Sequence, residues 1–462
     1  MSERLSTGIR ELDEILDGGL LRHSMNIFMG APGTGKTILA EQIAFFHAAR
    51  GETVLYLTTL SEPLEKFILH GQSYSFFDPS LVGESVLYED LALILQGSDD
   101  LSGVVEAVTQ MLARHKPRLL VIDSFKALDR PGLHPEKRRM VVFDLATVLA
   151  SFDCTTILVG EYGPETLTEL PEFAIADGIL QLSKLHIGMR EQRFLRVEKL
   201  RGSNSMEGMH AFSITADGLE IYPRLRTPPA SPDYASPVDR VKTGIEGLDP
   251  MIGGGLWRGS TTLLAGPTGG GKTLMSLHFL ASGALAGEAG VYVGFQENPV
   301  QLRRTLCNFG FDDEALLGGG KFEHMYRSPV EMQIDSVVLD LFRRVREKKV
   351  RRIVIDALGD LRHRSYDKQR LIEYLYSLTQ WFAVEGVTCI VAVEVQNSTD
   401  DERITSDEMS TMSDNIISIR FDNRRQMSRQ IRVLKARNSG HDHLERTLVI
   451  SSEGVRVERN ET

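Results

Sequence analysis

The chain has 462 residues, which is too long for one ordinary hydrophobic core and predicts roughly two to four domains. Its 42% hydrophobic and 25% charged residues are ordinary values for a globular protein, and no apolar run approaches the roughly 18 residues that span a membrane. The net charge of −11, from 63 acids and 52 bases, disfavours non-specific binding to nucleic acid, so neither a membrane nor a nucleic acid is an expected partner.

The N-terminus carries no apolar segment of the signal-peptide type. The cysteines Cys154, Cys307 and Cys389 are isolated, and their spacing matches neither a zinc site nor a thiol redox pair. These features predict a reduced, cytoplasmic protein whose cysteines are core residues.

Three segments of the first half recur in the second half. They are “STGIRELDEILDGGL” (6–20) with “KTGIEGLDPMIGGGL” (242–256), “GAPGTGKT” (30–37) with “GPTGGGKT” (266–273), and, more loosely, “EKLRGS” (198–203) with “LKARNS” (434–439). The offset is constant, since 243 − 7, 272 − 36 and 435 − 199 all equal 236. Three matches at one offset predict a tandem duplication.

The duplication sets the expected domain boundaries. We predict a first domain at residues 1–225, a linker at 226–238 and a second domain at 239–462. The stretch “RTPPASPDYASP” (226–237) is rich in Pro, Ser and Ala, a composition that suits a semi-extended linker.

Within each repeat, short apolar runs alternate with helical patterns. The predicted strands are 25–30, 53–58, 119–124 and 155–160 in the first repeat, and 261–266, 290–295, 352–357 and 388–393 in the second. Helical patterns at 137–151 and 369–385 lie between some of these runs. Such alternation predicts two tandem α/β domains with mainly parallel central sheets that are covered on both faces.

Both G-x-x-x-x-G-K-T motifs follow a predicted strand and begin a predicted helix, which is the context of a phosphate-binding P-loop. Lys36 and Lys272 are expected to reach the terminal phosphates of ATP, and Thr37 and Thr273 to place a hydroxyl on Mg²⁺. The alternative is a Gly-rich turn without a ligand. The predicted binding residues are Gly30, Gly33, Thr34, Gly35, Lys36 and Thr37 in the first domain, and Gly266, Gly269, Gly270, Gly271, Lys272 and Thr273 in the second.

Asp123 and Asp356 follow apolar strands in the two repeats. An acid at this position can hold the magnesium shell, as the second carboxylate of P-loop proteins does, so we predict both as metal and ATP-site residues. The alternative is a buried aspartate that caps a loop.

The paired P-loops, the “TGI…LD…GGL” segments and the “KLRG”/“KAR” segments together resemble the KaiC family over almost the whole chain. These are RecA-like tandem ATPases whose founding members drive the cyanobacterial circadian clock. The resemblance implies two RecA-like P-loop NTPase domains and a homo-oligomer, a hexameric double ring with ATP between neighbouring subunits. It also implies four cations that reach a neighbour's phosphates: Lys199, Arg201, Lys435 and Arg437. The alternative for these cations is a solvated strand end.

The stretch “DEMSTMSD” (407–414) gains a meaning from this resemblance. In the family, the second domain phosphorylates an adjacent Ser–Thr pair that is followed by an Asp. Ser410, Thr411 and Asp414 match that arrangement, and Thr405 matches a third hydroxyl site nearby. The resemblance therefore implies that Ser410 and Thr411 are phosphoacceptors, whereas the residues alone also fit a polar loop with capping hydroxyls.

The chain departs from the family where two adjacent glutamates should follow the second strand. The first domain has Leu60 and Ser61 at these positions, with Glu62 one residue beyond, so we expect that site to hold ATP and the ring rather than to hydrolyse ATP. The second domain has Gln296 and Glu297. Glu297 is the predicted base, Gln296 is predicted to orient a water, and Glu394 is an alternative base. For both glutamates the alternative is a side chain that faces the surface.

The leading hypothesis is an ATP-dependent Ser/Thr autokinase with weak ATPase activity, acting in signalling or timing through an unidentified protein partner. A second hypothesis is an ATP-stabilised ring that acts as a scaffold without kinase activity. A third, a RecA-type DNA motor, is disfavoured by the acidic charge and by the lack of an evident basic, aromatic strand-binding loop.

Overall fold

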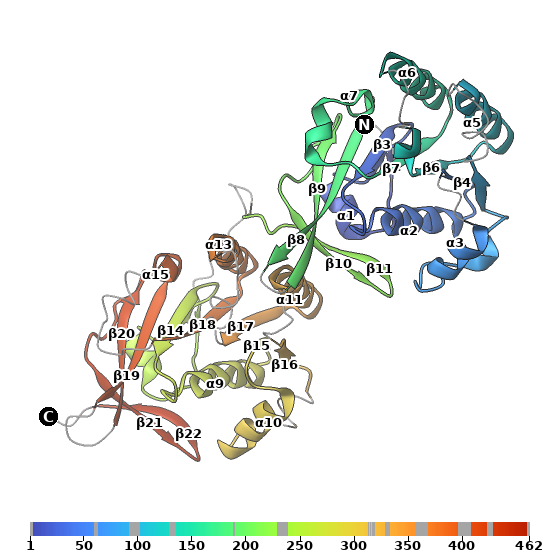
Figure 1. Ribbon diagram of the computed structural model, residues 1–462. Helices are drawn as coiled ribbons and strands as arrows, with labels where there is room; N and C mark the ends of the chain where they lie inside the picture. Colours follow the sequence, from blue (N-terminus) through green and yellow to red (C-terminus); the bar gives the residue numbers. More distant parts are fainter. Residues whose placement is uncertain are drawn as a thin grey trace. The chain divides into compact units, whose positions relative to one another are not determined.

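The computed structural model describes residues 3–59, 63–91, 102–128, 135–187, 190–228, 239–312, 314, 316, 319–328, 333–356, 368–395, 408–422 and 428–459. Contacts divide the chain into two compact units, Met1–Arg224 and Leu225–Thr462. Each unit is an α/β domain, and the colour gradient of Figure 1 runs through the first unit from blue to green and through the second to red. Within the described ranges, no helix is long and apolar enough to cross a membrane.

The first unit is built on a nine-stranded sheet with the order β11-β10-β9-β8-β3-β7-β6-β4-β5. Its strands are β3 (Met25–Met29), β4 (Val54–Thr58), β5 (Val86–Asp90), β6 (Leu119–Asp123), β7 (Thr155–Gly160), β8 (Gly178–Ile187), β9 (Arg190–Leu200), β10 (His210–Thr215) and β11 (Gly218–Tyr222), while β1 (Arg4–Leu5) pairs with β2 (Leu20–Leu21). Its helices are α1 (Arg10–Ile15), α2 (Lys36–Ala48), α3 (Leu64–Gly71), α5 (Ser102–His115), α6 (Pro135–Ser151) and α7 (Pro171–Ile175), with short turns of helix at η1 (Pro79–Leu81), η2 (Phe125–Leu128) and η3 (Pro164–Thr168).

The second unit repeats this plan with the sheet order β16-β15-β17-β18-β14-β19-β20-β21-β22. Its strands are β14 (Thr261–Gly266), β15 (Ala289–Gly294), β16 (Phe322–Tyr326), β17 (Val350–Asp356), β18 (Thr388–Glu394), β19 (Asn415–Asp422), β20 (Ser428–Ala436), β21 (Arg446–Ser451) and β22 (Gly454–Glu458), and β12 (Arg240–Val241) pairs with β13 (Leu256–Trp257). Its helices are α8 (Leu248–Met251), α9 (Lys272–Leu285), α10 (Pro299–Asn308), α11 (Ile334–Lys348), α13 (Lys368–Glu385) and α15 (Glu408–Met412).

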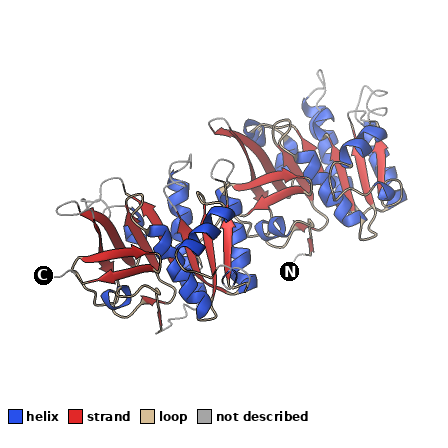
Figure 2. Cartoon of the chain, turned by 90° about the horizontal axis from the view of Figure 1, so that it is seen from below, coloured by secondary structure: helices blue, strands red, loops and turns tan. Residues whose placement is uncertain are grey.

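The expected α/β class with mainly parallel sheets is confirmed. In the first unit, β8, β3, β7, β6, β4 and β5 are parallel neighbours, and β9, β10 and β11 extend the sheet in antiparallel fashion. Every residue of β3 is buried, as expected for a central strand with helices on both faces (Figure 2).

Successive residues of β3 enter different cores. Phe28 packs with Leu39 of α2 on one face of the sheet, whereas Ile27 packs with Leu145 of α6 on the other. The helices α2 and α3 are drawn on one side of this sheet and α5 and α6 on the opposite side (Figure 1). The sheet therefore fixes where α2 begins, beside the carboxyl ends of the parallel strands.

A buried ion pair anchors the sheet of the second unit. Arg352 of β17 is 3% exposed and donates a hydrogen bond to Glu288 at 2.7 Å and others to the carbonyl oxygens of Lys242 and Phe279 at 2.8 and 2.7 Å. Arg258 also pairs with Glu288, at 2.9 Å. A charge this deeply buried requires such partners.

The expectation that all three cysteines are core residues is wrong for one of them. Cys154 and Cys389 are buried, but Cys307 is exposed on α10. Cysteine is a small hydrophobe that can occupy either face of a partly exposed helix, so its residue type alone does not place it in the core.

Candidate nucleotide-binding sites

The turn between β3 and α2 has the conformation that a phosphate-binding loop needs. Gly30 has φ of 149°, and an added Cβ there would lie 2.0 Å from the Leu182 carbonyl oxygen. Gly35 caps α2 in the left-handed region, with φ of 101°. The corresponding Gly271 caps α9 at 103°. Only glycine meets both demands without strain, so the backbone amides of the turn and the helix N-terminus can face a phosphate.

The P-loop lysines are held at the base of this turn. Lys36 is 6% exposed and donates to the Ala31 carbonyl oxygen at 2.9 Å, an oxygen that also accepts the Thr34 hydroxyl at 2.9 Å. Lys272 is 8% exposed and donates to the carbonyl oxygens of Gly266 and Pro267, both at 2.9 Å. The ammonium groups thus lie within the loops that the motifs predicted.

Burial lowers the pKa of Lys36, and the nearby carboxylates of Glu161 and Asp123 partly oppose this shift. The pKa of Lys272 is lowered in the same way, against Asp356 and Glu394. Burial disfavours an ammonium group that has no counter-charge. An anion bound in the loop would supply that counter-charge.

In each unit, a threonine at the start of the P-loop helix donates a hydrogen bond to an aspartate at the end of a strand. The Thr37 hydroxyl donates to Asp123 Oδ2 at 2.7 Å, and the Thr273 hydroxyl donates to Asp356 Oδ2 at 2.7 Å. The predicted pairs of hydroxyl and carboxylate oxygens are therefore brought together in both units.

A buried tyrosine completes each pair. Tyr56 of β4 donates to Asp123 Oδ2 at 3.2 Å, and Tyr292 of β15 donates to Asp356 Oδ2 at 2.8 Å. Neither tyrosine was predicted from the sequence, although 292 − 56 equals the repeat offset of 236 and relates the two positions. Burial beside a carboxylate raises the pKa of each phenol well above 10.0, so both hydroxyls remain protonated donors.

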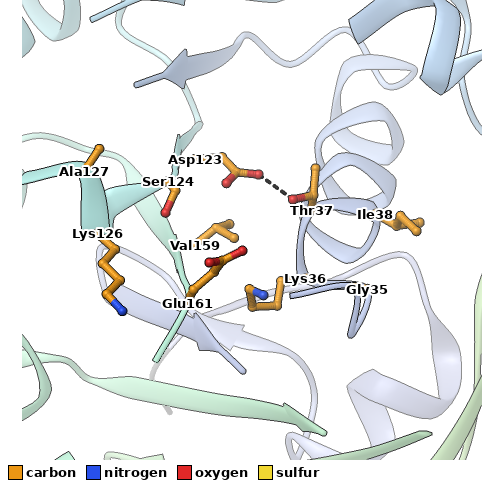
Figure 3. Close-up of a pocket in the computed structure, with 11 residues that line it drawn as sticks. Gly35, Lys36, Thr37, Ile38, Asp123, Ser124, Lys126, Ala127, Val159 and Glu161 are labelled. Atoms are coloured by element: carbon orange, nitrogen blue, oxygen red, sulfur yellow. Dashed lines mark hydrogen bonds between the residues drawn. The ribbon is translucent and has the colours of Figure 1, made fainter. Parts of the chain in front are cut away.

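A cavity of about 450 Å³ opens beside the first P-loop (Figure 3). It is lined by Gly33, Gly35, Lys36, Thr37, Ile38, Asp123, Ser124, Lys126, Ala127, Val159 and Glu161. Figure 3 shows Lys36 and Thr37 on the side of α2, with Asp123 and Glu161 facing them from the ends of β6 and β7. The cavity suits a polyphosphate because its wall combines loop amides, an ammonium and a hydroxyl–carboxylate pair.

Glu161 is a second acid at this site that the sequence analysis did not identify. Its counterpart in the second unit is Glu394, which was considered as a base, at an offset of 233 rather than 236. The same offset of 233 relates Asp123 to Asp356. The second repeat is three residues shorter before this point, so an alignment at the offset of 236 does not pair Glu161 with Glu394. Glu394 accepts a hydrogen bond from the Thr268 hydroxyl of the P-loop at 2.5 Å, which places it at the loop's edge.

Of the two residues predicted to act on the nucleophile, Gln296 is exposed and Glu297 is half-buried. Burial raises the pKa of Glu297, and the nearby Asp356 carboxylate raises it further. Its Oε2 atom is buried and has no hydrogen-bond partner among the described residues. A carboxylate in this state is a candidate proton acceptor. The corresponding first-unit residues, Leu60, Ser61 and Glu62, lie outside the described residues.

The second-unit cations bind the segment that carries the predicted phosphoacceptors. Lys435 of β20 donates to the carbonyl oxygens of Ser410 and Ser413 at 2.6 and 2.7 Å, and Arg437 donates to that of Thr411 at 3.0 Å. Ser410 is 4% exposed, whereas Thr411 is exposed. The third predicted hydroxyl, Thr405, lies outside the described residues.

The first unit has similar contacts, but the residues contacted there carry no hydroxyl. Lys199 donates to the carbonyl oxygens of Phe173 and Ala174 at 3.2 and 3.0 Å, and Arg201 donates to that of Ala174 at 3.2 Å. Arg201 also pairs with Asp177 at 3.4 Å. All four cations thus contact carbonyl oxygens at the end of a short helix in their own chain, and their action on a neighbour's phosphates stays a prediction.

Comparison with known proteins relates the whole chain to one family. The family model described as “ATPase: KaiC” matches residues 5–226 and again 241–462. The circadian clock oscillator protein KaiC of Picosynechococcus sp. is 29% identical over 468 residues, covering 98% of this chain and 89% of the relative. KaiC 1 of Synechocystis sp. is 28% identical over 465 residues, with coverages of 98% and 88%. KaiC of Nostoc sp. is 28% identical over 469 residues, with coverages of 99% and 89%.

Proposed function

The chain belongs to the KaiC family of ATPases, and on this premise we propose that it is an ATP-dependent Ser/Thr autokinase with weak ATPase activity. The proposed assembly is a homo-oligomeric ring, a hexamer by analogy, which signals or keeps time through a further protein partner. The observation that carries the kinase proposal is the contact of Lys435 and Arg437 with the backbone of Ser410, Thr411 and Ser413.

We place one Mg-ATP at each P-loop. Lys36 and Lys272 would contact the terminal phosphates, and the loop amides would surround the others. The hydroxyl and carboxylate of each Thr–Asp pair, 2.7 Å apart, are oxygen ligands of the kind Mg²⁺ prefers, so these residues fit the ion. When bound, Mg²⁺ would neutralise part of the phosphate charge.

A second cavity in the first unit favours a nucleotide over inorganic phosphate as the ligand. It measures about 350 Å³ and shares Thr37 and Ile38 with the phosphate cavity. Phe67 and Tyr74 supply aromatic surface to its wall. A planar base could pack against such surface while its phosphates extend into the neighbouring cavity.

The proposed kinase step takes place at the second P-loop. The hydroxyl oxygen of Ser410 or Thr411 attacks the γ-phosphorus of ATP, Glu297 accepts the hydroxyl proton, and the bond between the γ-phosphorus and the β–γ bridging oxygen breaks to release ADP. The raised pKa of Glu297 suits this role, because a base whose pKa lies nearer the working pH accepts a proton more readily.

The acceptors of one subunit would face the ATP of its neighbour. Lys435 and Arg437 bind the backbone that carries Ser410 and Thr411, so the cations and the acceptors would reach that ATP together. The cations would stabilise charge on the transferred phosphoryl group. In the first unit, Phe173 and Ala174 stand at the positions of the acceptors, so we assign that site to holding ATP.

The test is incorporation of label from ATP radiolabelled at the γ-phosphate. Wild-type protein should retain label, Lys272→Ala should retain none, and the matched Lys36→Ala should retain label if its ring still assembles. Binding of ATP without retained label would instead support the second hypothesis, a scaffold ring. The scaffold hypothesis is supported by the first unit, where Lys199 and Arg201 contact Phe173 and Ala174, two residues that carry no hydroxyl.

A further inference from the structure

Lys126 contributes a second ammonium-bearing side chain to the cavity beside the first P-loop. It comes from η2, directly after β6, whereas Lys36 comes from α2. Figure 3 shows the two lysines entering from different sides, with Glu161 drawn between them. Lys126 is exposed to solvent, and no hydrogen bond or ion pair joins its ammonium to the residues that the structure describes.

An aromatic ring supports the Lys126 side chain. The Lys126 ammonium lies 5.8 Å from the centre of the Tyr162 ring. The ring itself is 3% exposed, its hydroxyl donates to Glu172 at 3.2 Å, and it packs edge-on against Phe173 at 5.1 Å. A fixed ring below the side chain restricts where the ammonium can go, which reduces the entropy lost when it binds an anion.

The second unit has neither member of this pair. At the offset of 233 that relates Asp123 to Asp356, Lys126 corresponds to Gly359 and Tyr162 to Val395. Two lysines, Lys36 and Lys126, and two carboxylates, Asp123 and Glu161, therefore line the first cavity. Among the residues described around the second P-loop, Lys272 lies near Asp356 and Glu394, Glu297 lies near Asp356, and Arg429 donates to the Gly269 carbonyl oxygen at 3.2 Å. The second lysine makes the first cavity a favourable place for an additional negative charge.

We propose that Lys126 binds the terminal phosphate of a nucleoside triphosphate in the first unit, and that this contact makes the first site select triphosphate over diphosphate. The inference rests on the proposed binding of nucleotide at the first P-loop. In the proposed complex the inner phosphates would lie against the loop and the start of α2, so the cavity wall that includes Ser124, Lys126 and Glu161 would face the outer end of the chain of phosphates. A cation on that wall contacts the group that ADP lacks.

This role differs from that of Lys36. Lys36 lies within the loop, where it would contact the phosphates of ATP and of ADP alike, whereas only a third phosphate would reach Lys126. Leu60 and Ser61 replace the two glutamates expected after the second strand, so the first site has no predicted base at these positions. In the proposed complex it has instead a lysine contact that distinguishes ATP from ADP. The combination suits a site that holds ATP for a long time.

The test uses the full-length chain and photolabelling with 8-azido-ATP that is radiolabelled at the α-phosphate. Proteolysis separates labelled peptides of residues 1–225 from those of 239–462, so each unit is read independently. Unlabelled ATP and ADP then compete with the probe for wild-type protein, Lys126→Met, Lys126→Arg and the control Lys137→Met, which removes an exposed lysine of α6.

Lys126→Met should weaken ATP competition at the first unit by about 10-fold to 100-fold, because hydrogen bonds to charged groups contribute on that order. ADP competition should change by less than about 3-fold, and labelling of the second unit should not change. Lys126→Arg should keep most of the preference for ATP, and Lys137→Met all of it. If Lys126→Met does not fold, Lys126→Gln takes its place in the same comparison.

An ATP affinity within about 2-fold of wild type would overturn the inference, and so would equal losses for ATP and ADP, which a purely structural role on Tyr162 predicts. Failure of the underlying proposal looks different. In that case the wild-type first unit takes up no label, or its labelling survives Lys36→Ala.

Discussion

The hydrogen bond between Tyr292 and Asp356 gives the sharpest stability prediction. The phenol oxygen lies 2.8 Å from Asp356 Oδ2, and the two residues are 2% and 7% exposed. Tyr292→Phe keeps the ring and removes only the donor. A hydrogen bond to a charged group contributes about 1.5 to 3 kcal/mol, so we expect the free energy of unfolding of the second unit to fall by about that amount.

Tyr56→Phe is the matched control in the first unit. Its hydrogen bond to Asp123 is longer, 3.2 Å, and Asp123 is only half-buried. Because water can partly replace this donor, we expect a loss of about 0.5 to 1.5 kcal/mol, and it should fall on the first unit alone.

The assay is urea unfolding without nucleotide, followed by tryptophan fluorescence. Both tryptophans of the chain, Trp257 and Trp381, lie in the second unit, so the signal follows that unit. Tyr292→Phe should move the midpoint to lower urea with an unchanged slope, and Tyr56→Phe should not move it. A loss below about 0.5 kcal/mol for Tyr292→Phe would refute the view that this donor stabilises the Asp356 carboxylate.

Three further outcomes follow from the second unit. Glu297→Gln should abolish phosphoryl transfer yet raise the melting temperature at neutral pH. Because the pKa of Glu297 is raised in the folded chain, the free energy of unfolding falls as the pH rises above 4.5, the ordinary pKa of a glutamate. Glutamine does not ionise and so removes this loss of stability. Below pH 4.5 the variant should therefore be no more stable than the wild type. Lys435→Met should speed amide hydrogen exchange of the peptide 408–414 by about 10-fold, whereas Lys199→Met should leave that peptide unchanged. Arg352→Met should cost about 3 kcal/mol in the tryptophan assay, because it leaves Glu288 partly buried with one partner fewer, and an unchanged midpoint would contradict this.

The features that sequence predicts best here are local. The strand 155–160 is observed with those bounds, and the strand before each P-loop is confirmed because an apolar run followed by a Gly-rich turn leaves few other conformations. The antiparallel strands β8 and β9 were not predicted. Their residues mix apolar and charged side chains without strict alternation, as in “FLRVEKL” (194–200), so the two-residue periodicity that identifies a half-buried strand is weak.

The site shows the same division between local and distant information. Lys36 and Thr37 follow from one motif, but the part played by Tyr56 depends on a strand that only the folded sheet brings beside Asp123. The contacts of Lys435 with the end of α15 join residues 22 and 25 positions apart, and no spacing rule predicts them. Comparing the two repeats at both offsets is the sequence signal that would have found Tyr292 and Glu161.

The central claim is that Ser410 and Thr411 receive phosphate from the ATP of a neighbouring subunit. The most direct measurement mixes Lys272→Ala chains, which keep the acceptors, with Ser410→Ala/Thr411→Ala chains, which keep the P-loop, and adds Mg-ATP. Phosphopeptide mass spectrometry then reads the peptide that contains residues 408–414. The account predicts phosphate on Ser410 or Thr411 of the Lys272→Ala chains in the mixture and none on these chains alone. Wild-type protein that binds ATP yet carries no phosphate on either residue would contradict it.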